Sequence, residues 1–251
     1  MKLRAPFYPR NEHFAIDLPG AQAVFTTRRG GHSSGPYTSL NLGRLTDDDP
    51  AAVARNRDTL EGQLPAKLTF VRQVHGRAVD RVDEPSAERA RRARPDELSR
   101  ADGQVTGVPG LALAALTADC LPVAVGGDGA VAMLHAGWRG LRDGVIASGV
   151  SALRELGVRG PLGAAVGPGA GGCCYQVGPE VHEAFDDYPA AHLNGGRLDL
   201  KAIAAEQLQR SGVDEVHDLG LCTICADRSL LFSHRRDGGI TGRQAGVAWL
   251  S

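Results

Sequence analysis

The stretch Leu111-Ala-Leu-Ala-Ala-Leu-Thr-Ala-Asp119-Cys120 is an apolar run that ends in a carboxylic acid and a thiol. A second run, Ala130-Val-Ala-Met-Leu134-His135, ends in an imidazole. Packing alone explains reactive side chains at the ends of apolar strands poorly. Substrate clefts of α/β proteins form at strand ends. A thiol and an imidazole placed there indicate either a metal site or a Cys/His nucleophile.

The segments around these two runs predict a mixture of strands and helices. Residues 121–126 read as a strand, and Gly126-Gly-Asp-Gly129 as a hairpin turn that leads into the second run. Because strands and helices mix without strict alternation, we predict one α/β domain over 1–251 with a single mixed β-sheet rather than a Rossmann fold. Further strands are expected over 13–27 (two strands), 68–74, 110–118, 162–166, 213–219 and 246–250, with a strand end near 230–237. Helices are expected over 51–60, 141–156, 179–185 and 200–210. The charged stretch 84–100 is expected to be an exposed loop or a short helix.

Composition narrows the function classes. The 251 residues carry a net charge of -1, so no global basic field is present to attract nucleic acid. No run of 18 apolar residues predicts a membrane span, and the start of the chain has no apolar signal core, so we expect a cytoplasmic protein. The five cysteines are an odd number, which favours thiols or ligands over a disulfide framework. The sequence leaves the oligomeric state open and allows a monomer.

Three candidate ligands follow predicted strands: His75, Cys120 and His135. Two imidazoles and one thiolate suit zinc and leave a fourth position open, as catalytic zinc sites require. The alternative is a buried cysteine beside two surface imidazoles. A third interpretation makes Cys120 a nucleophile whose pKa is lowered by His135 and Arg139. Asp119 is expected to point away from Cys120 if the strand continues through both residues.

The remaining cysteines give weaker signals. Cys222-Thr-Ile-Cys225 is a Cys-x-x-Cys pair that could bind zinc or exchange disulfides. No second such pair and no nearby pair of histidines completes a site in the sequence. Cys173 and Cys174 are adjacent, and in an extended chain neighbouring side chains point to opposite faces. We therefore expect at most one of them to face a pocket.

Candidate substrate ligands lie in glycine-rich turns. Arg28-Arg29 and Arg235-Arg236 each place two guanidinium groups there, which suits phosphate or carboxylate, although a solvated basic turn is the simpler interpretation of each. The loop 30–43 lacks the P-loop pattern. Asn41 is the residue of that loop best suited to bind a ribose or a base, and its alternative is an ordinary turn asparagine.

Taken together, the motifs resemble one bacterial family over nearly the whole chain, from about residue 13 to the end. It is the purine nucleoside phosphorylase family of laccase-domain, or polyphenol-oxidase-like, proteins, some of which are called peptidoglycan editing factors. The matching stretches begin with Thr26–Gly43, Gln73–Gly76, Ala101–Thr106, Thr117–Pro122 and His135–Gly140. They continue with Gly167–Gly178, Cys222-Thr223, Phe232–Asp237 and Thr241–Gln244.

The resemblance implies a metal, usually zinc and alternatively copper, held by His75, Cys120 and His135. It implies phosphorolysis of adenosine, inosine, guanosine and methylthioadenosine to the free base and a sugar 1-phosphate. Adenosine deamination and a copper-dependent oxidation of phenols are also attributed to the family. The fold it implies is a layered α/β/α domain that resembles the cysteine hydrolase-like fold.

On this hypothesis Cys120, His135, His75 and Asp119 are catalytic, with Asp119 as the nearest general acid or base for a deamination. Arg28 and Arg139 are the candidates for holding phosphate, and Asn41 for contacting the nucleoside. The first alternative is a Cys/His hydrolase or amidase that acts on peptidoglycan precursors. The second alternative is a copper oxidase, which ranks last because the eight histidines form no His-x-His clusters.

Overall fold

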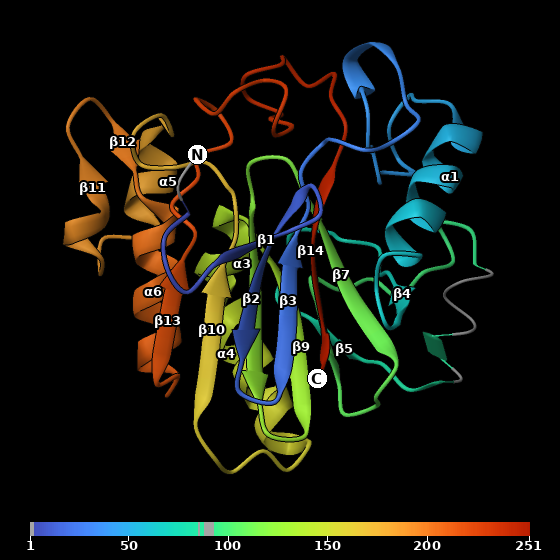
Figure 1. Ribbon diagram of the computed structural model, residues 1–251. Coiled ribbons are helices and arrows are strands. Elements are labelled where there is room, and N and C mark those ends of the chain that lie inside the picture. The colour runs from blue at the N-terminus through green and yellow to red at the C-terminus, as the bar shows by residue number, and fades with distance from the viewer. Residues whose placement is uncertain (1–2, 85, 88–92) are drawn as a thin grey trace.

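The computed structural model of the protein describes residues 3–84, 86–87 and 93–251. Two six-stranded sheets lie at its centre, and each mixes parallel with antiparallel pairs (Figure 1). The first sheet has the order β1 (Tyr8–Arg10), β2 (His13–Leu18), β3 (Ala21–Phe25), β14 (Gln244–Leu250), β7 (Leu111–Thr117) and β4 (Lys67–Thr69). The second has the order β13 (Glu215–Asp218), β10 (Leu162–Val166), β8 (Leu121–Gly127), β9 (Ala130–Ala136), β6 (Gly103–Thr106) and β5 (Val79–Arg81).

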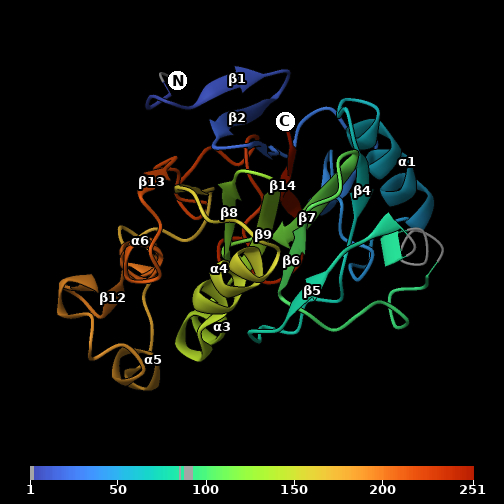
Figure 2. The same cartoon turned by 90° about the horizontal axis from the view of Figure 1, so that it is seen from below.

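The helices and a small hairpin complete the described part of the chain. The α-helices are α1 (Pro50–Glu61), α3 (Trp138–Asp143), α4 (Val145–Glu155), α5 (Pro179–Glu183) and α6 (Leu200–Arg210). Two short 3-10 helices, η1 (Gly35–Tyr37) and η2 (Pro189–Ala191), and the strands β11 (His192–Leu193) and β12 (Arg197–Leu198) lie in the connections. Figure 2 shows α3, α4 and α6 together on one side of the second sheet, away from β1 and β2.

Three apolar layers hold these elements together. The inner faces of the two sheets pack on each other through residues such as Phe25, Leu113 and Met133. The other face of the second sheet is covered by α4 and α6. The outer face of the first sheet is covered by Leu60 of α1 and by Leu42 of the loop before it. The order of layers is therefore helices, sheet, sheet, and an outer cover of α1 with its preceding loop.

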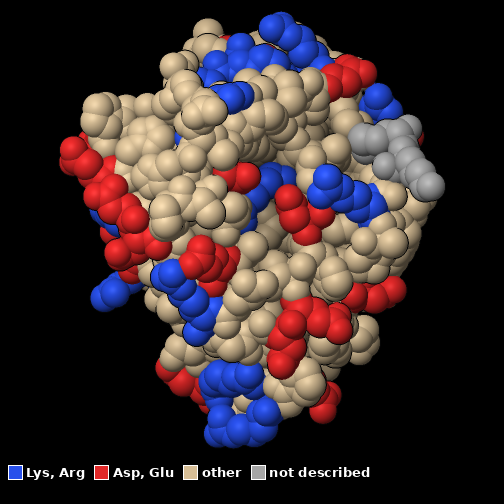
Figure 3. Space-filling view, turned by 90° about the vertical axis from the view of Figure 1, so that its left-hand side faces the viewer, with Lys and Arg blue, Asp and Glu red and all other residues tan. Residues whose placement is uncertain are grey.

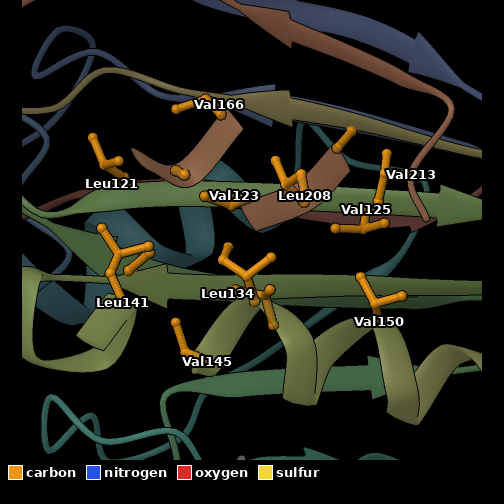
Figure 4. Close-up of a cluster of buried hydrophobic side chains, with 14 of the residues drawn as sticks. Leu121, Val123, Val125, Leu134, Leu141, Val145, Val150, Val166, Leu208 and Val213 are labelled. Carbon is orange, nitrogen blue, oxygen red and sulfur yellow. The ribbon is translucent and has the colours of Figure 1, made fainter. Parts of the chain in front are cut away.

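Strand β9 shows why both of its faces are apolar. Successive side chains of a strand point to opposite faces. Leu134 points to the helix side, where Figure 4 shows it near Val145 of α4, while Met133 packs between the sheets. At about 25 cal/mol per Å² of apolar surface, burial of both faces contributes a large share of the stability.

The mixed α/β class is confirmed, but the prediction of a single sheet is wrong. Strands β7 and β8 are neighbours in sequence, and we expected them to lie in one sheet. Instead β7 pairs with β14 and β4, whereas β8 pairs with β9 and β10. The chain crosses from one sheet to the other through Ala118–Cys120, where Asp119 has φ +101°. The relation to the cysteine hydrolase-like fold stays a prediction.

Other segments differ from expectation in detail. The predicted helix 141–156 is two helices, because Gly144 adopts φ +91° and ends α3. The predicted strand 68–74 ends at Thr69. In the described structure, 230–237 contains no strand. Of the predicted exposed stretch 84–100, residues 85 and 88–92 lie outside the described residues, and 93–100 form an irregular and largely exposed segment.

Surface charge and helix length agree with the composition. Basic and acidic side chains are interspersed over the face that carries α5 and α6 (Figure 3). Among the described residues, no helix combines the length and the hydropathy needed to cross a membrane.

Candidate metal centre

The crossover between the two sheets positions the predicted ligands. Cys120 lies at its end, one residue before β8, and His135 lies in β9 opposite Pro122 of β8. His75 reaches the same place from the loop after β4, with φ +61°. One ligand atom from each of the three residues lies within 4.8 Å of the others, and we call this group the His2Cys cluster. The two imidazole rings are 4.9 Å apart and nearly perpendicular.

Asp102, one residue before β6, orients both histidines. Its Oδ1 accepts a hydrogen bond from His135 Nδ1 at 2.8 Å and from the His75 backbone N–H at 2.8 Å. Its Oδ2 accepts from the N–H groups of Gly76 (2.7 Å) and Val74 (3.1 Å). Because a carboxylate only accepts, His135 holds its proton on Nδ1 and presents Nε2 toward the cluster.

Sequence reasoning missed the role of Asp102. The side chain is fully buried, which acts to raise the carboxyl pKa. The hydrogen bonds from His135, Gly76 and Val74 and the charge of His135 together outweigh burial and lower the pKa. The only signal in the sequence was its place in the Ala101–Thr106 motif.

The electrostatics of the cluster favour a thiolate. Burial acts to raise the pKa of Cys120, but the charge of His135 and hydrogen bonds from both imidazoles outweigh it and lower the pKa to about 6. Burial acts to lower the pKa of His135, while the Cys120 charge and the Asp102 hydrogen bond raise it to about 9. Without a metal, the two groups therefore form a thiolate–imidazolium pair.

The donor set fits a borderline-soft metal ion. Two imidazoles and one thiolate match the ligands of zinc, and copper also accepts them. Gly137 makes room for the three side chains, because a Cβ there would lie 2.9 Å from Cys120 Sγ and 3.2 Å from His75 Cδ2. The same three residues could equally present a nucleophilic thiolate to a substrate.

A pocket of about 420 Å³ opens over the cluster and is lined by all three of its residues. Its walls combine the aromatic rings of Phe70 and Tyr175 with guanidinium groups that include those of Arg235 and Arg243. The Thr117 hydroxyl is buried in this wall and has no hydrogen-bond partner among the described residues. The pocket is therefore suited to a flat apolar ring that carries an anionic and a hydroxyl-bearing part.

The predicted catalytic acid Asp119 lines the pocket, but both of its oxygens have protein partners. Oδ1 accepts from Thr223 Oγ1 at 2.6 Å, and Oδ2 accepts from the Arg235 N–H at 2.7 Å. The carboxylate thus joins the crossover to two points of the connection between β13 and β14. Its catalytic role stays a prediction.

The predicted substrate-binding residues Arg28, Arg139 and Asn41 lie in three different environments. Arg28 donates to the carbonyls of Thr38, Pro36 and Arg228, stacks on Phe232, and is not among the pocket-lining residues. Arg139 is exposed on α3 and stacks on Trp138.

Asn41 is fully buried. Its Oδ1 accepts from the N–H groups of Gly43 and Arg243, and its Nδ2 donates to Thr46 and Asp48. The amide therefore holds the backbone of Arg243, which lines the pocket. The substrate-binding roles of Arg28, Asn41 and Arg139 stay predictions.

The four other cysteines also come together, contrary to expectation. Cys173, Cys174, Cys222 and Cys225 place their sulfurs within 4.8 Å of one another, and we call this group the four-cysteine cluster. The expectation failed because residues 172–174 form a turn, in which neighbouring side chains need not alternate.

Fold and site together define a two-sheet α/β protein with a His2Cys cluster at the crossover between its sheets. The profile of the family described as multi-copper polyphenol oxidoreductase laccase matches residues 22–251. The chain therefore belongs to this laccase-domain family, as its motifs predicted.

Similar proteins are found among purine nucleoside phosphorylases and among solved structures. A purine nucleoside phosphorylase of Streptomyces coelicolor is 41% identical, with 92% of this chain and 96% of the relative covered. A purine nucleoside phosphorylase of Xylella fastidiosa is 42% identical, with 92% and 93% covered. Among solved structures, the Bacillus licheniformis protein YfiH superposes with a TM-score of 0.91 at 33% identity, with 99% of this chain and 100% of that one covered. The Neisseria meningitidis protein NMB0706 gives 0.83 at 35% identity, with 96% and 100% covered.

Proposed function

We propose that this protein is a zinc-dependent purine nucleoside phosphorylase that cleaves adenosine, inosine, guanosine and methylthioadenosine with phosphate. The observation that carries the proposal is the His2Cys cluster, braced by Asp102, at the floor of a pocket of about 420 Å³. The names of the relatives from Streptomyces and Xylella support this substrate class. We also propose adenosine deamination in the same pocket.

Three residues of the chain hold the metal in this proposal: His75, Cys120 and His135. When bound there, zinc supplies Lewis acidity and positive charge beside the substrate. Asp102 keeps the His135 proton on Nδ1, so that Nε2 is available as a ligand. Copper held by the same residues is the alternative that metal analysis tests.

In phosphorolysis a phosphate oxygen attacks C1′ of the sugar while the bond from C1′ to the purine nitrogen breaks. The pocket residues bind and orient the two reactants for this exchange. Arg235 and Arg243 present guanidinium groups that suit phosphate, and the Phe70 and Tyr175 rings suit the purine face.

Arg235 and Arg243 replace Arg28 in this assignment. All three guanidinium groups donate to backbone carbonyls, but Arg235 and Arg243 line the pocket and Arg28 does not. Arg235 and Arg243 also replace Arg139, which is exposed on α3 and is not among the pocket-lining residues. Asn41 acts indirectly, through the backbone of Arg243.

Metal analysis and a phosphate-dependent assay test the proposal together. The wild-type protein should bind zinc at the His2Cys cluster and release free base from inosine and adenosine only when phosphate is present. His75→Ala should lose that zinc ion and base release together. His217→Ala, on β13 and outside the pocket lining, is the matched control and should keep both. Full phosphorolysis by His75→Ala without this metal would contradict the mechanism.

A charge-conserving change tests the phosphate site. Arg243→Lys keeps the charge but loses the planar fork, so the KM for phosphate should rise roughly tenfold while zinc content stays unchanged. Arg159→Lys, which lies outside the pocket lining, should leave the KM unchanged. An unchanged KM for phosphate in Arg243→Lys would remove this residue from the phosphate site.

The second candidate function is a cysteine hydrolase acting on peptidoglycan precursors. The thiolate–imidazolium pair of Cys120 and His135 specifically favours it. Alkylation of Cys120 should then abolish activity in protein stripped of metal. In the phosphorylase proposal, stripped protein is already inactive, and zinc restores it.

A further inference from the structure

The four-cysteine cluster joins two loops that are distant in sequence. Cys173 and Cys174 lie in the loop after β10, and Cys222 and Cys225 in the loop after β13. Because β10 and β13 are parallel neighbours, both loops leave the same edge of the second sheet. Gly169 and Cys222 also form a parallel bridge between the two loops, which fixes their register.

A tight turn brings the adjacent cysteines to the same side. The N–H groups of Cys174 and Tyr175 both donate to the Gly171 carbonyl, at 2.9 Å and 3.0 Å. Gly171 leaves room for the sulfurs, because a Cβ there would lie 3.1 Å from Cys222 Cβ and 3.3 Å from Cys173 Sγ. The chain thus folds around the thiols more closely than a side chain at Gly171 would allow.

The Cys-x-x-Cys loop surrounds one sulfur with backbone donors. The Gly171 N–H donates to Cys222 Sγ at 3.3 Å. The backbone N–H groups of Cys225 and Ile224 also donate to this thiol group. Backbone donors that converge on a sulfur favour its thiolate, which is the form that binds metals.

The sulfur spacing matches a tetrahedral ion. Cys173 Sγ and Cys225 Sγ are 3.7 Å apart. Two thiolates at about 2.3 Å from a tetrahedral zinc ion are about 3.8 Å apart, whereas disulfide sulfurs are separated by about 2.05 Å. We propose that Cys173, Cys174, Cys222 and Cys225 hold a structural zinc ion, separate from the His2Cys cluster. Binding displaces the thiol protons, and four protein ligands leave no open position for a substrate.

This ion would fasten two walls of the pocket. Tyr175, next to Cys174, lines the pocket. Thr223, next to Cys222, holds Asp119 beside Cys120 through its 2.6 Å hydrogen bond. The two clusters are thus linked through a few bonds, although each has its own ligands.

Zinc stoichiometry tests the proposal. Wild-type protein should hold two zinc ions per chain. His75→Ala should hold one, surrounded by four sulfurs at about 2.3 Å in X-ray absorption spectra. The double variant Cys222→Ser/Cys225→Ser should hold one ion with mixed nitrogen and sulfur ligands. Cys120→Ser is the matched control, because it removes one thiol from the other cluster and should leave the four-sulfur signal intact.

If the double variant fails to fold, counting the reactive thiols of His75→Ala still tests the proposal. In His75→Ala, chelation should raise the number of thiols that react with a disulfide reagent by four. Folded His75→Ala that lacks zinc and shows four reactive thiols from the start would overturn the proposal. Two permanently unreactive thiols, recovered only by a reductant, would show a disulfide and also overturn it. Neither result depends on phosphorolysis, so a failure of the proposed activity leaves this test unaffected.

Discussion

Asp102→Asn is the most informative single change at the metal centre. The amide keeps the size of the carboxylate but replaces one acceptor oxygen with a donor. With its nitrogen in the Oδ2 position, it opposes the N–H groups of Val74 and Gly76. With its nitrogen in the Oδ1 position, it opposes the N–H of His75 and removes the acceptor that keeps the His135 proton on Nδ1. Neither orientation satisfies all four donors.

The magnitude follows from this conflict. A buried donor without a partner costs about 1–3 kcal/mol, so the loss of two acceptor contacts should cost about 3 kcal/mol of unfolding free energy. For a chain of this size, 1 kcal/mol corresponds to roughly 2–4 °C in Tm, so Tm should fall by about 6–12 °C. Misorientation of His75 and His135 should weaken zinc binding at the His2Cys cluster roughly 10–100-fold.

Competition with a coloured chelator measures the zinc affinity, and thermal melting of the stripped protein measures the stability. Asp143→Asn is the control, because this carboxylate is exposed and pairs with Arg142 at the surface; it should change neither quantity measurably. An Asp102→Asn protein that binds zinc within about twofold of wild type would refute the claim that this carboxylate orients the ligands.

Two further changes test the surroundings of the site. Gly137→Ala places a Cβ 2.9 Å from Cys120 Sγ and should lower zinc affinity at the His2Cys cluster with little change in helix content. Gly160→Ala is the control, because a Cβ there meets nothing within 4 Å. Equal zinc affinity in the two variants would contradict this prediction. The hydrogen bond from Arg236 lowers the pKa of Asp237 below its usual 3.8, and burial opposes this effect without cancelling it. The ionised Asp237 therefore stabilises the folded state above pH 3.8, and this stabilisation is lost as the pH falls through the pKa of the folded state. Asp237→Asn should therefore cost about 2 kcal/mol at pH 7 and progressively less as the pH falls below 3.8 in melting experiments, and a cost independent of pH would contradict this assignment.

The local elements were predictable because each has a strong signal of its own. The run toward Cys120 is a strand as far as Thr117, and the run that ends in His135 is a strand. Of the predicted turn 126–129, Gly126 and Gly127 belong to β8, and Asp128-Gly129 forms the turn to β9. The division into two sheets was not predictable, because an apolar strand buried on both faces carries no record of which strand it pairs with. Asp119, which separates β7 from β8, adopts a positive φ. A glycine would have signalled such a backbone in the sequence, whereas an aspartate does not.

The site shows the same limit. The chemistry of His75, Cys120 and His135 identified them as a group before any geometry was known. Asp102 was missed because a buried acceptor of backbone N–H groups resembles any other aspartate in a sequence. The four-cysteine cluster was not predicted, because side chains alternate only in an extended chain and residues 172–174 form a turn.

One edge of the molecule carries all of these groups, and strand direction explains why. Strands β9, β10 and β13 run in the same direction, so His135 and the loops that hold the four cysteines leave the second sheet on one side. Strands β6 and β8 run the opposite way and begin on that side, which places Asp102 and Cys120 there. Asp119 follows strand β7 of the first sheet and reaches the same side, where its carboxylate binds the connection between β13 and β14. Each ligand of the His2Cys cluster is therefore anchored at the end of a strand or on Asp102, whereas the four cysteines depend on the conformation of the two loops that hold them.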